Sequence, residues 1–140
     1  MNQLKLMFRK LNNLFLENQQ DSFFIFYPEK IKKMLEFFSK EFVGTVLYAV
    51  KANPADCVLE QVIEHGIKSF DVASLKEVIL ISKKLPDSQI YFMNTVKSRF
   101  SIRESYFRYK VRNFSIDSID ELKKIIEETN SANDLVIYLR

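Results

Sequence analysis

The sequence predicts an α/β fold with a parallel sheet, and three observations lead to this prediction. Short apolar segments alternate along the chain with longer segments whose apolar residues recur with helical spacing. A helical segment, rather than a hairpin turn, separates each apolar segment from the next, which is the pattern of βα units. The apolar segments also lack a polar face, as expected of strands that are covered on both sides.

The composition is typical of one folded domain. The 140 residues suffice for a core, and 47% hydrophobic with 28% charged residues argues against disorder. A net charge of +3 requires neither a nucleic acid nor a membrane as partner. Cys57 is the only cysteine, so no internal disulfide and no zinc or other metal cluster is expected. With apolar runs too short for a bilayer and no signal-peptide cleavage site, we expect a cytoplasmic protein.

The elements can be placed in order along the chain. Residues 1–22 are expected to form an amphipathic helix and a polar linker, and residues 23–140 the main unit. The helical spacing rests on Leu4, Met7, Phe8, Leu11 and Phe15. Strands are expected at 23–27 ("FFIFY"), 45–50, 68–73, 89–93, 111–116 and 134–140.

Start and stop signals delimit the helices between these strands. Pro28 and Pro54 are placed to begin helices, and Gly66 to end one. Three capping boxes of the form S-x-x-E are expected to begin the others. They are Ser74 with Glu77, Ser101 with Glu104 in a helix from Ser98 to about Tyr109, and Ser118 with Glu121.

A lysine, Lys51, ends the apolar strand at 45–50. In parallel βα folds the chemistry lies at the carboxyl ends of strands. Asp71, Asn94 and Arg140 also fall at strand ends, so the four side chains are expected to converge on one rim. From spacing alone two interpretations stay open: Lys51 reaches water, or it forms an imine with a carbonyl compound. Asp71 is equally open to being a solvated loop acid.

The segment 97–112 interleaves basic and aromatic residues, a pattern that can bind single-stranded nucleic acid. A helix with inward aromatics and outward arginines explains the same pattern more simply. We therefore expect no nucleic-acid partner.

Two motifs together carry a family resemblance. "LYAVKANP" (47–54), followed by "SFDVAS" (69–74), closely resembles the N-terminal barrel of the ornithine/diaminopimelate/arginine decarboxylases. These are pyridoxal-phosphate (PLP) enzymes that share their barrel with alanine racemase. The likeness continues through "QIYFMNTVKS", "FSIDSIDELKKI" and "LVIYLR". It implies a partial (β/α) TIM-type barrel with about five of the eight strands, preceded by the N-terminal helix and the extra strand "FFIFY".

The resemblance also implies roles for individual residues. Lys51 matches the lysine that holds PLP as a Schiff base, and Asp71 an aspartate near it. Arg140 matches an arginine that contacts the cofactor, and Glu77 a glutamate on the same face of the site. Ser74 and Asn94 are possible supporting residues. Thr95 stands where the family commonly has proline, which weakens the assignment of Asn94.

The implied function is that of the N-terminal part of a PLP-dependent amino-acid decarboxylase, ornithine first, in polyamine biosynthesis. The alternatives are a diaminopimelate decarboxylase-type enzyme, a non-catalytic PLP-binding protein and a truncated gene product. The family is homodimeric, and it takes a stacking histidine, a glycine-rich phosphate loop, an acid facing the pyridine nitrogen and a β domain from segments not matched here. We therefore expect this chain alone to be inactive, with a separate chain as a possible source of the remainder.

Overall fold

The computed structural model describes residues 10, 13 and 25–140. The helix and linker predicted for residues 1–22 therefore lie almost wholly outside the described residues. Within that segment the two described positions, Lys10 and Asn13, are helical.

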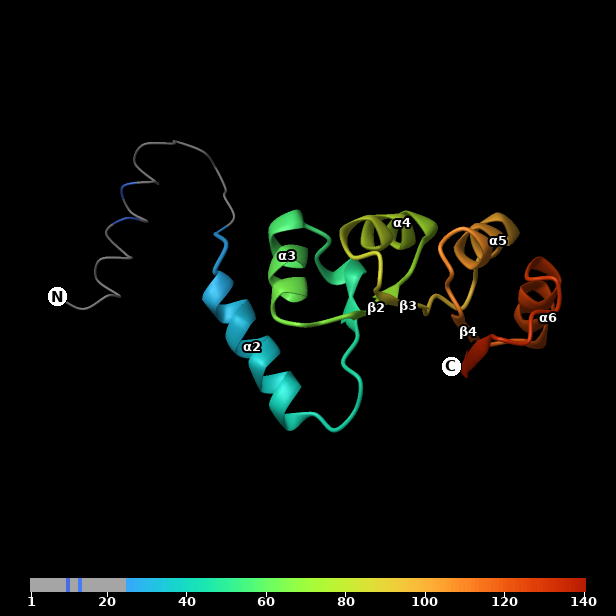
Figure 1. Ribbon diagram of the computed structural model, residues 1–140, viewed down its shortest axis with the longest axis horizontal. Coiled ribbons are helices and arrows are strands. Elements are labelled where there is room, and N and C mark those ends of the chain that lie inside the picture. Colours follow the sequence, from blue (N-terminus) through green and yellow to red (C-terminus); the bar gives the residue numbers. More distant parts are fainter. Residues whose placement is uncertain (1–9, 11–12, 14–24) are drawn as a thin grey trace.

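Five parallel strands form one sheet whose spatial order follows the sequence, β1-β2-β3-β4-β5. The strands are β1 (Tyr48–Ala49), β2 (Ser69–Val72), β3 (Gln89–Phe92), β4 (Asn113–Ile116) and β5 (Val136–Leu139). The helices are α2 (Pro28–Glu41), α3 (Asp56–Glu64), α4 (Leu75–Lys84), α5 (Arg99–Phe107) and α6 (Ile119–Glu128), and the 3-10 turn η1 (Val50–Ala52) follows β1. Figure 1 shows α3 to α6 along one face of the sheet, with α2 beside the β1 end. The predicted α/β fold is confirmed, and its sequential parallel order is that of a partial (β/α) barrel.

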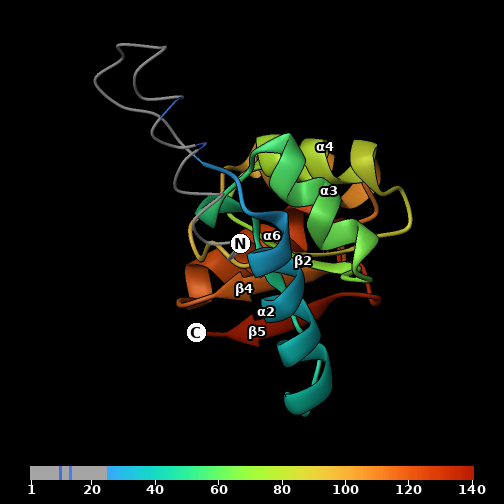
Figure 2. The same ribbon diagram turned by 90° about the vertical axis from the view of Figure 1, so that its left-hand side faces the viewer.

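The core lies between the sheet and its helices. Phe70, Phe92 and Phe114 on three neighbouring strands are fully buried, and the rings of Phe92 and Phe114 lie 6.2 Å apart. Burying each such side chain contributes roughly 1.5–3 kcal/mol. Because side chains alternate along a strand, Asp71 and Tyr91 lie on the opposite face of the sheet. In Figure 2, viewed from the β1 end, α3 and α4 lie above the strands and α2 crosses in front of them.

Serine caps begin three of the helices. Ser74 and Ser118 accept hydrogen bonds from the amides of Glu77 and Glu121, which confirms the predicted starts of α4 and α6. The capping box predicted at Ser101 and Glu104 is wrong. Ser98 is the cap of α5 and accepts from the Ser101 amide at 3.1 Å. Because the helix begins at Ser98, as predicted, Ser101 and Glu104 lie inside its first turns and do not cap it.

The strand predicted at "FFIFY" is also wrong for its described residues. Residues 25–27 are not in a strand, and Ile25 and Phe26 are both more than 40% exposed. A strand needs a neighbour for its backbone hydrogen bonds, and residues 25–27 pair with none of the five strands. The strand predicted at 45–50 is shorter for a related reason. Among residues 25–140, β1 pairs only with β2, over Tyr48 and Ala49, before the chain turns at Val50.

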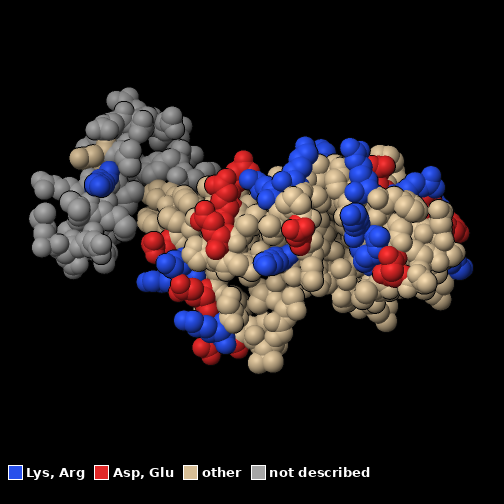
Figure 3. Space-filling view, viewed as in Figure 1, with Lys and Arg blue, Asp and Glu red and all other residues tan. Residues whose placement is uncertain are grey.

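Ion pairs join α5 to α6 on the outer surface. Arg99 and Arg103 contact the two carboxylate oxygens of Glu128 at 2.9 and 2.8 Å. The hydrogen bond from Arg99 lowers the pKa of Glu128, against the opposing effect of burial, and Arg103 lowers it further. Figure 3 shows basic and acidic side chains side by side on the face viewed.

This pair predicts a pH dependence of stability. The pKa of Glu128 is lower in the folded chain than its value of about 4.3 in the unfolded chain. Its contribution to folding stability is therefore complete above the unfolded pKa and is lost as the pH falls through the folded pKa. Urea unfolding between pH 6 and pH 3 should therefore show a smaller fall in unfolding free energy for Glu128→Gln than for the wild type. Glu41→Gln, which removes an exposed carboxylate on α2, should keep the wild-type slope. If the unfolding free energy fell equally with pH in all three proteins, the assignment of this pH dependence to Glu128 would be refuted.

The two outer strands each pair on one side only among residues 25–140. β1 pairs with β2, and β5 pairs with β4. On β5, the side chain of Leu139 is 83% exposed. An exposed apolar strand edge is a template for association with another strand.

We predict that the 140-residue chain self-associates through these edges. Leu139→Lys should weaken association by about tenfold, or about 1.4 kcal/mol, because a charge on an edge strand opposes pairing. Sedimentation equilibrium over a range of concentrations measures the effect. Val43→Lys is the matched control, because Val43 is fully exposed in the loop before β1 and lies off the sheet. A monomeric wild type, or equal weakening by both substitutions, would contradict this prediction.

Candidate functional site

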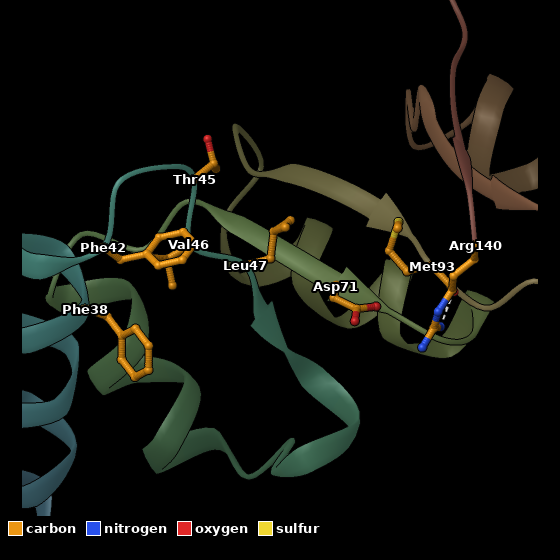
Figure 4. Close-up of a pocket in the computed structure, with 8 residues that line it drawn as sticks. All are labelled: Phe38, Phe42, Thr45, Val46, Leu47, Asp71, Met93 and Arg140. Carbon is orange, nitrogen blue, oxygen red and sulfur yellow. Dashed lines mark hydrogen bonds between the residues drawn. The ribbon is translucent and has the colours of Figure 1, made fainter.

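A cavity of about 450 Å³ is lined by side chains from both edges of the sheet. Asp71 of β2 contributes to it, as do Met93 directly after β3 and Arg140 directly after β5. Phe38 and Phe42 of α2 and residues 45–47 before β1 form the apolar side. The cavity therefore combines an apolar wall with one acidic and one basic side chain (Figure 4).

Strand pairing places Asp71 and a backbone hydrogen bond places Arg140. Asp71 lies in register with Ala49 of β1 and Tyr91 of β3, so it is inside β2, one residue before the strand end at which it was expected. The Arg140 guanidinium donates to the Met93 carbonyl at 3.1 Å, and the Arg140 amide donates to Ile116 at 2.9 Å. The sheet thus brings together two side chains that are 69 positions apart in sequence. A carboxylate and a guanidinium in one cavity can bind groups of opposite charge on one small ligand.

Lys51 lies outside the lining of this cavity. It follows β1 in the turn η1 and is exposed to solvent. The expected convergence of four polar side chains is therefore met only by Asp71 and Arg140. An exposed amine directly after a barrel strand is still accessible to a carbonyl compound.

The remaining predicted residues bond to the backbone of the rim. The Asn94 side chain donates to the carbonyls of Val96 at 2.9 Å and Ala73 at 3.4 Å. The Glu77 carboxylate accepts from the Ala73 amide at 2.7 Å, while Ser74 caps α4. These side chains shape the turns after β2 and β3 rather than facing the cavity.

Lys97 is a rim residue that the sequence did not reveal. It is 4% exposed, and its ammonium contacts the carboxylate of Glu121 at 3.0 Å. Burial lowers the pKa of Lys97, while the hydrogen bond and charge of Glu121 oppose that shift. Two features conceal it in the sequence: Lys97 lies in a loop, where no periodicity marks burial, and the capping box already accounts for Glu121.

Comparison with known proteins identifies the family to which this fold belongs. The family described as pyridoxal-dependent decarboxylase, pyridoxal binding domain, matches residues 28–140. A search of curated proteins found no match. Within residues 25–140 and at positions 10 and 13, no cluster of His, Cys, Asp and Glu is suited to a metal, and no helix is long and apolar enough to cross a bilayer.

Several solved structures share the fold. The arginine decarboxylase of Paramecium bursaria Chlorella virus, bound to agmatine, has a TM-score of 0.79 and 24% identity, covering 94% of this chain and 35% of that one. Lysine decarboxylase from Selenomonas ruminantium has a TM-score of 0.78 and 24% identity, and it also covers 94% of this chain and 35% of that one. Ornithine decarboxylase from Entamoeba histolytica has a TM-score of 0.69 and 29% identity, covering 81% of this chain and 34% of that one.

The chain spans about a third of the length of these structures. The family match covers every described element from α2 to β5. It confirms the resemblance carried by the Lys51 and Asp71 motifs, and with it pyridoxal phosphate as the cofactor. The chain therefore belongs to the pyridoxal-dependent decarboxylase family, and its residues 28–140 match the pyridoxal-binding domain of that family.

Proposed function

We propose that this chain is the N-terminal part of a decarboxylase of basic amino acids and that Lys51 is its cofactor-attachment residue. The observation that carries the proposal is the position of Lys51. It is an exposed amine directly after the first strand of a pyridoxal-binding sheet, whose next strand carries Asp71. The proposed partners are an amino-acid substrate, a second chain supplying the rest of the barrel and a β domain, and a second copy in a homodimer.

The residues present fit the cofactor in part. Lys51 supplies an amine for covalent attachment, and Arg140 supplies a guanidinium suited to a phosphate or carboxylate. The two glycines of the sequence, Gly44 and Gly66, precede β1 and β2 and so lie at the amino ends of the strands. Neither is placed to build a phosphate loop at the carboxyl rim, so the phosphate would need further groups.

The chain's own groups would act in two ways. Lys51 would hold the cofactor through its Nζ, which is exposed to solvent after β1. Asp71 and Arg140 would orient charged groups of the ligand in the adjoining cavity. Bound PLP supplies an electron sink for the pair left behind when carbon dioxide departs.

Ornithine is the substrate we propose first, in polyamine biosynthesis. The 29% identity to the Entamoeba ornithine decarboxylase supports it, although structures of arginine and lysine decarboxylases are also similar. A diaminopimelate decarboxylase-type enzyme is the second candidate. Comparing these substrates in the assembled enzyme would decide among them.

We predict that PLP and borohydride label Lys51 ahead of the other lysines. Reduction makes the attachment permanent, and peptide mass mapping locates it. Lys51→Ala should remove most of the label, whereas Lys76→Ala, at an exposed lysine on α4, should leave it unchanged. Label spread evenly over surface lysines, and unchanged in Lys51→Ala, would reject the proposed attachment site.

We also predict that the 140-residue chain alone releases carbon dioxide from ornithine, lysine or diaminopimelate no faster than free PLP. Each missing pre-organised group costs on the order of 100-fold to 1000-fold in rate. The phosphate loop and the acid for the ring nitrogen are absent from the motifs matched in this chain. Release of labelled carbon dioxide measures the rate. Turnover well above free PLP, and abolished by Lys51→Ala, would show that the chain suffices.

A further inference from the structure

We infer that Lys97 is a positioning residue that holds the rim of the sheet so that Arg140 faces the cavity. Its ammonium donates to the carbonyl of Ser115 at 2.6 Å and to that of Asn94 at 2.9 Å, as well as to Glu121. A fourth, longer contact reaches Thr95 at 3.5 Å. An ammonium has three donors, so the three short contacts saturate it.

Lys97 and Arg140 hold neighbouring carbonyls at the same two strand ends. After β3, Lys97 bonds to Asn94 while the Arg140 side chain bonds to Met93. At the end of β4, Lys97 bonds to Ser115 while the Arg140 amide bonds to Ile116. Both partners of Arg140 are thus one residue away from a carbonyl that Lys97 holds. A shift of either strand end would move Arg140 within the cavity.

The burial of Lys97 makes this arrangement rigid. A buried ammonium is stable only when it is paired and fully hydrogen-bonded. Glu121 supplies the charge, and its carboxylate also accepts from the Lys97 amide at 3.2 Å. The strand-end carbonyls supply the other bonds, so displacing them leaves a buried charge unsatisfied.

The hydrogen bonds around Lys97 connect through Asn94 to the turn after β2, the strand that carries Asp71. The Asn94 side chain reaches the Ala73 carbonyl, and the Ala73 amide is held by Glu77. Lys97 therefore anchors a chain of bonds that joins the turns after β2, β3 and β4. This role goes beyond the attachment function of Lys51 and rests on it only for its effect on cofactor loading.

Lys97→Met tests the inference, with Lys124→Met as a matched control. Lys124 pairs with the same Glu121 carboxylate at 2.5 Å, but as an i,i+3 pair within α6, and its side chain is partly exposed. Hydrogen exchange with mass spectrometry follows the amides of Met93 and Arg140, which bond to Val72 and Ile116. In Lys97→Met these amides should exchange at least tenfold faster while α3 keeps its wild-type rate. In Lys124→Met all should stay near wild type.

A second readout is cofactor loading. The PLP concentration for half-maximal borohydride labelling of Lys51 should rise about tenfold in Lys97→Met and remain unchanged in Lys124→Met. If Lys97→Met fails to fold, Lys97→Gln replaces it, because its shorter, uncharged side chain has only two N–H donors and cannot hold Glu121, Asn94 and Ser115 together. The variant that folds should show the same selective change at the Met93 and Arg140 amides.

The outcomes separate the two proposals. Wild-type exchange at Met93 and Arg140 in the Lys97 variant, or acceleration equal to that of α3, would overturn the positioning role. Unchanged loading of Lys51 in that variant would overturn it as well. Failure of the wild-type chain to label Lys51 would refute the attachment proposal, while the exchange data would still decide the role of Lys97.

Discussion

Parallel pairing of the strands in sequence order is the constraint on which the rest of the structure depends. It requires a helix between successive strands, and those helices bury Phe70, Phe92 and Phe114. It also brings every carboxyl end to the same rim, where the turns after β2, β3 and β4 can bond to one another. Asp71 lies on β2 and Arg140 follows β5. They share a cavity only because β2, β3, β4 and β5 pair in register.

The rim contains two groups of polar side chains with different tasks. Asp71 and Arg140 face the cavity, whereas Asn94, Glu77 and Lys97 bond to backbone groups. The residues of the second group fix the positions of Asp71 and Arg140, because strand ends that carry buried hydrogen bonds resist displacement. Burying Lys97 with Glu121 has a desolvation cost, and breaking such a pair by removing one partner typically costs about 3–5 kcal/mol. The buried pair therefore favours a single geometry of the strand ends, and a cofactor site requires side chains held in one geometry.

The open sheet edges link the fold to the proposed function. β1 leads into Lys51 and β5 into Arg140, and each lacks a second neighbour among residues 25–140. The residues proposed to attach and contact the cofactor therefore lie at the two margins of the sheet. Strands that completed the barrel would pair with both margins and enclose the cavity between them.

The sequence by itself determined the features that depend on near neighbours. Periodicity and local caps located the βα units, since Ser74 and Ser118 bond to amides three residues away. The resemblance of the motifs around Lys51 and Asp71 predicted the family that the family match confirms. Only the tertiary structure decided which polar residues meet. The pairing of Lys97 with Glu121 across 24 positions, the shared cavity of Asp71 and Arg140, and the absence of a strand at residues 25–27 depend on neighbours distant in sequence. Hydrogen bonds and ion pairs of that range follow from how the strands assemble, and no local pattern of residues encodes them.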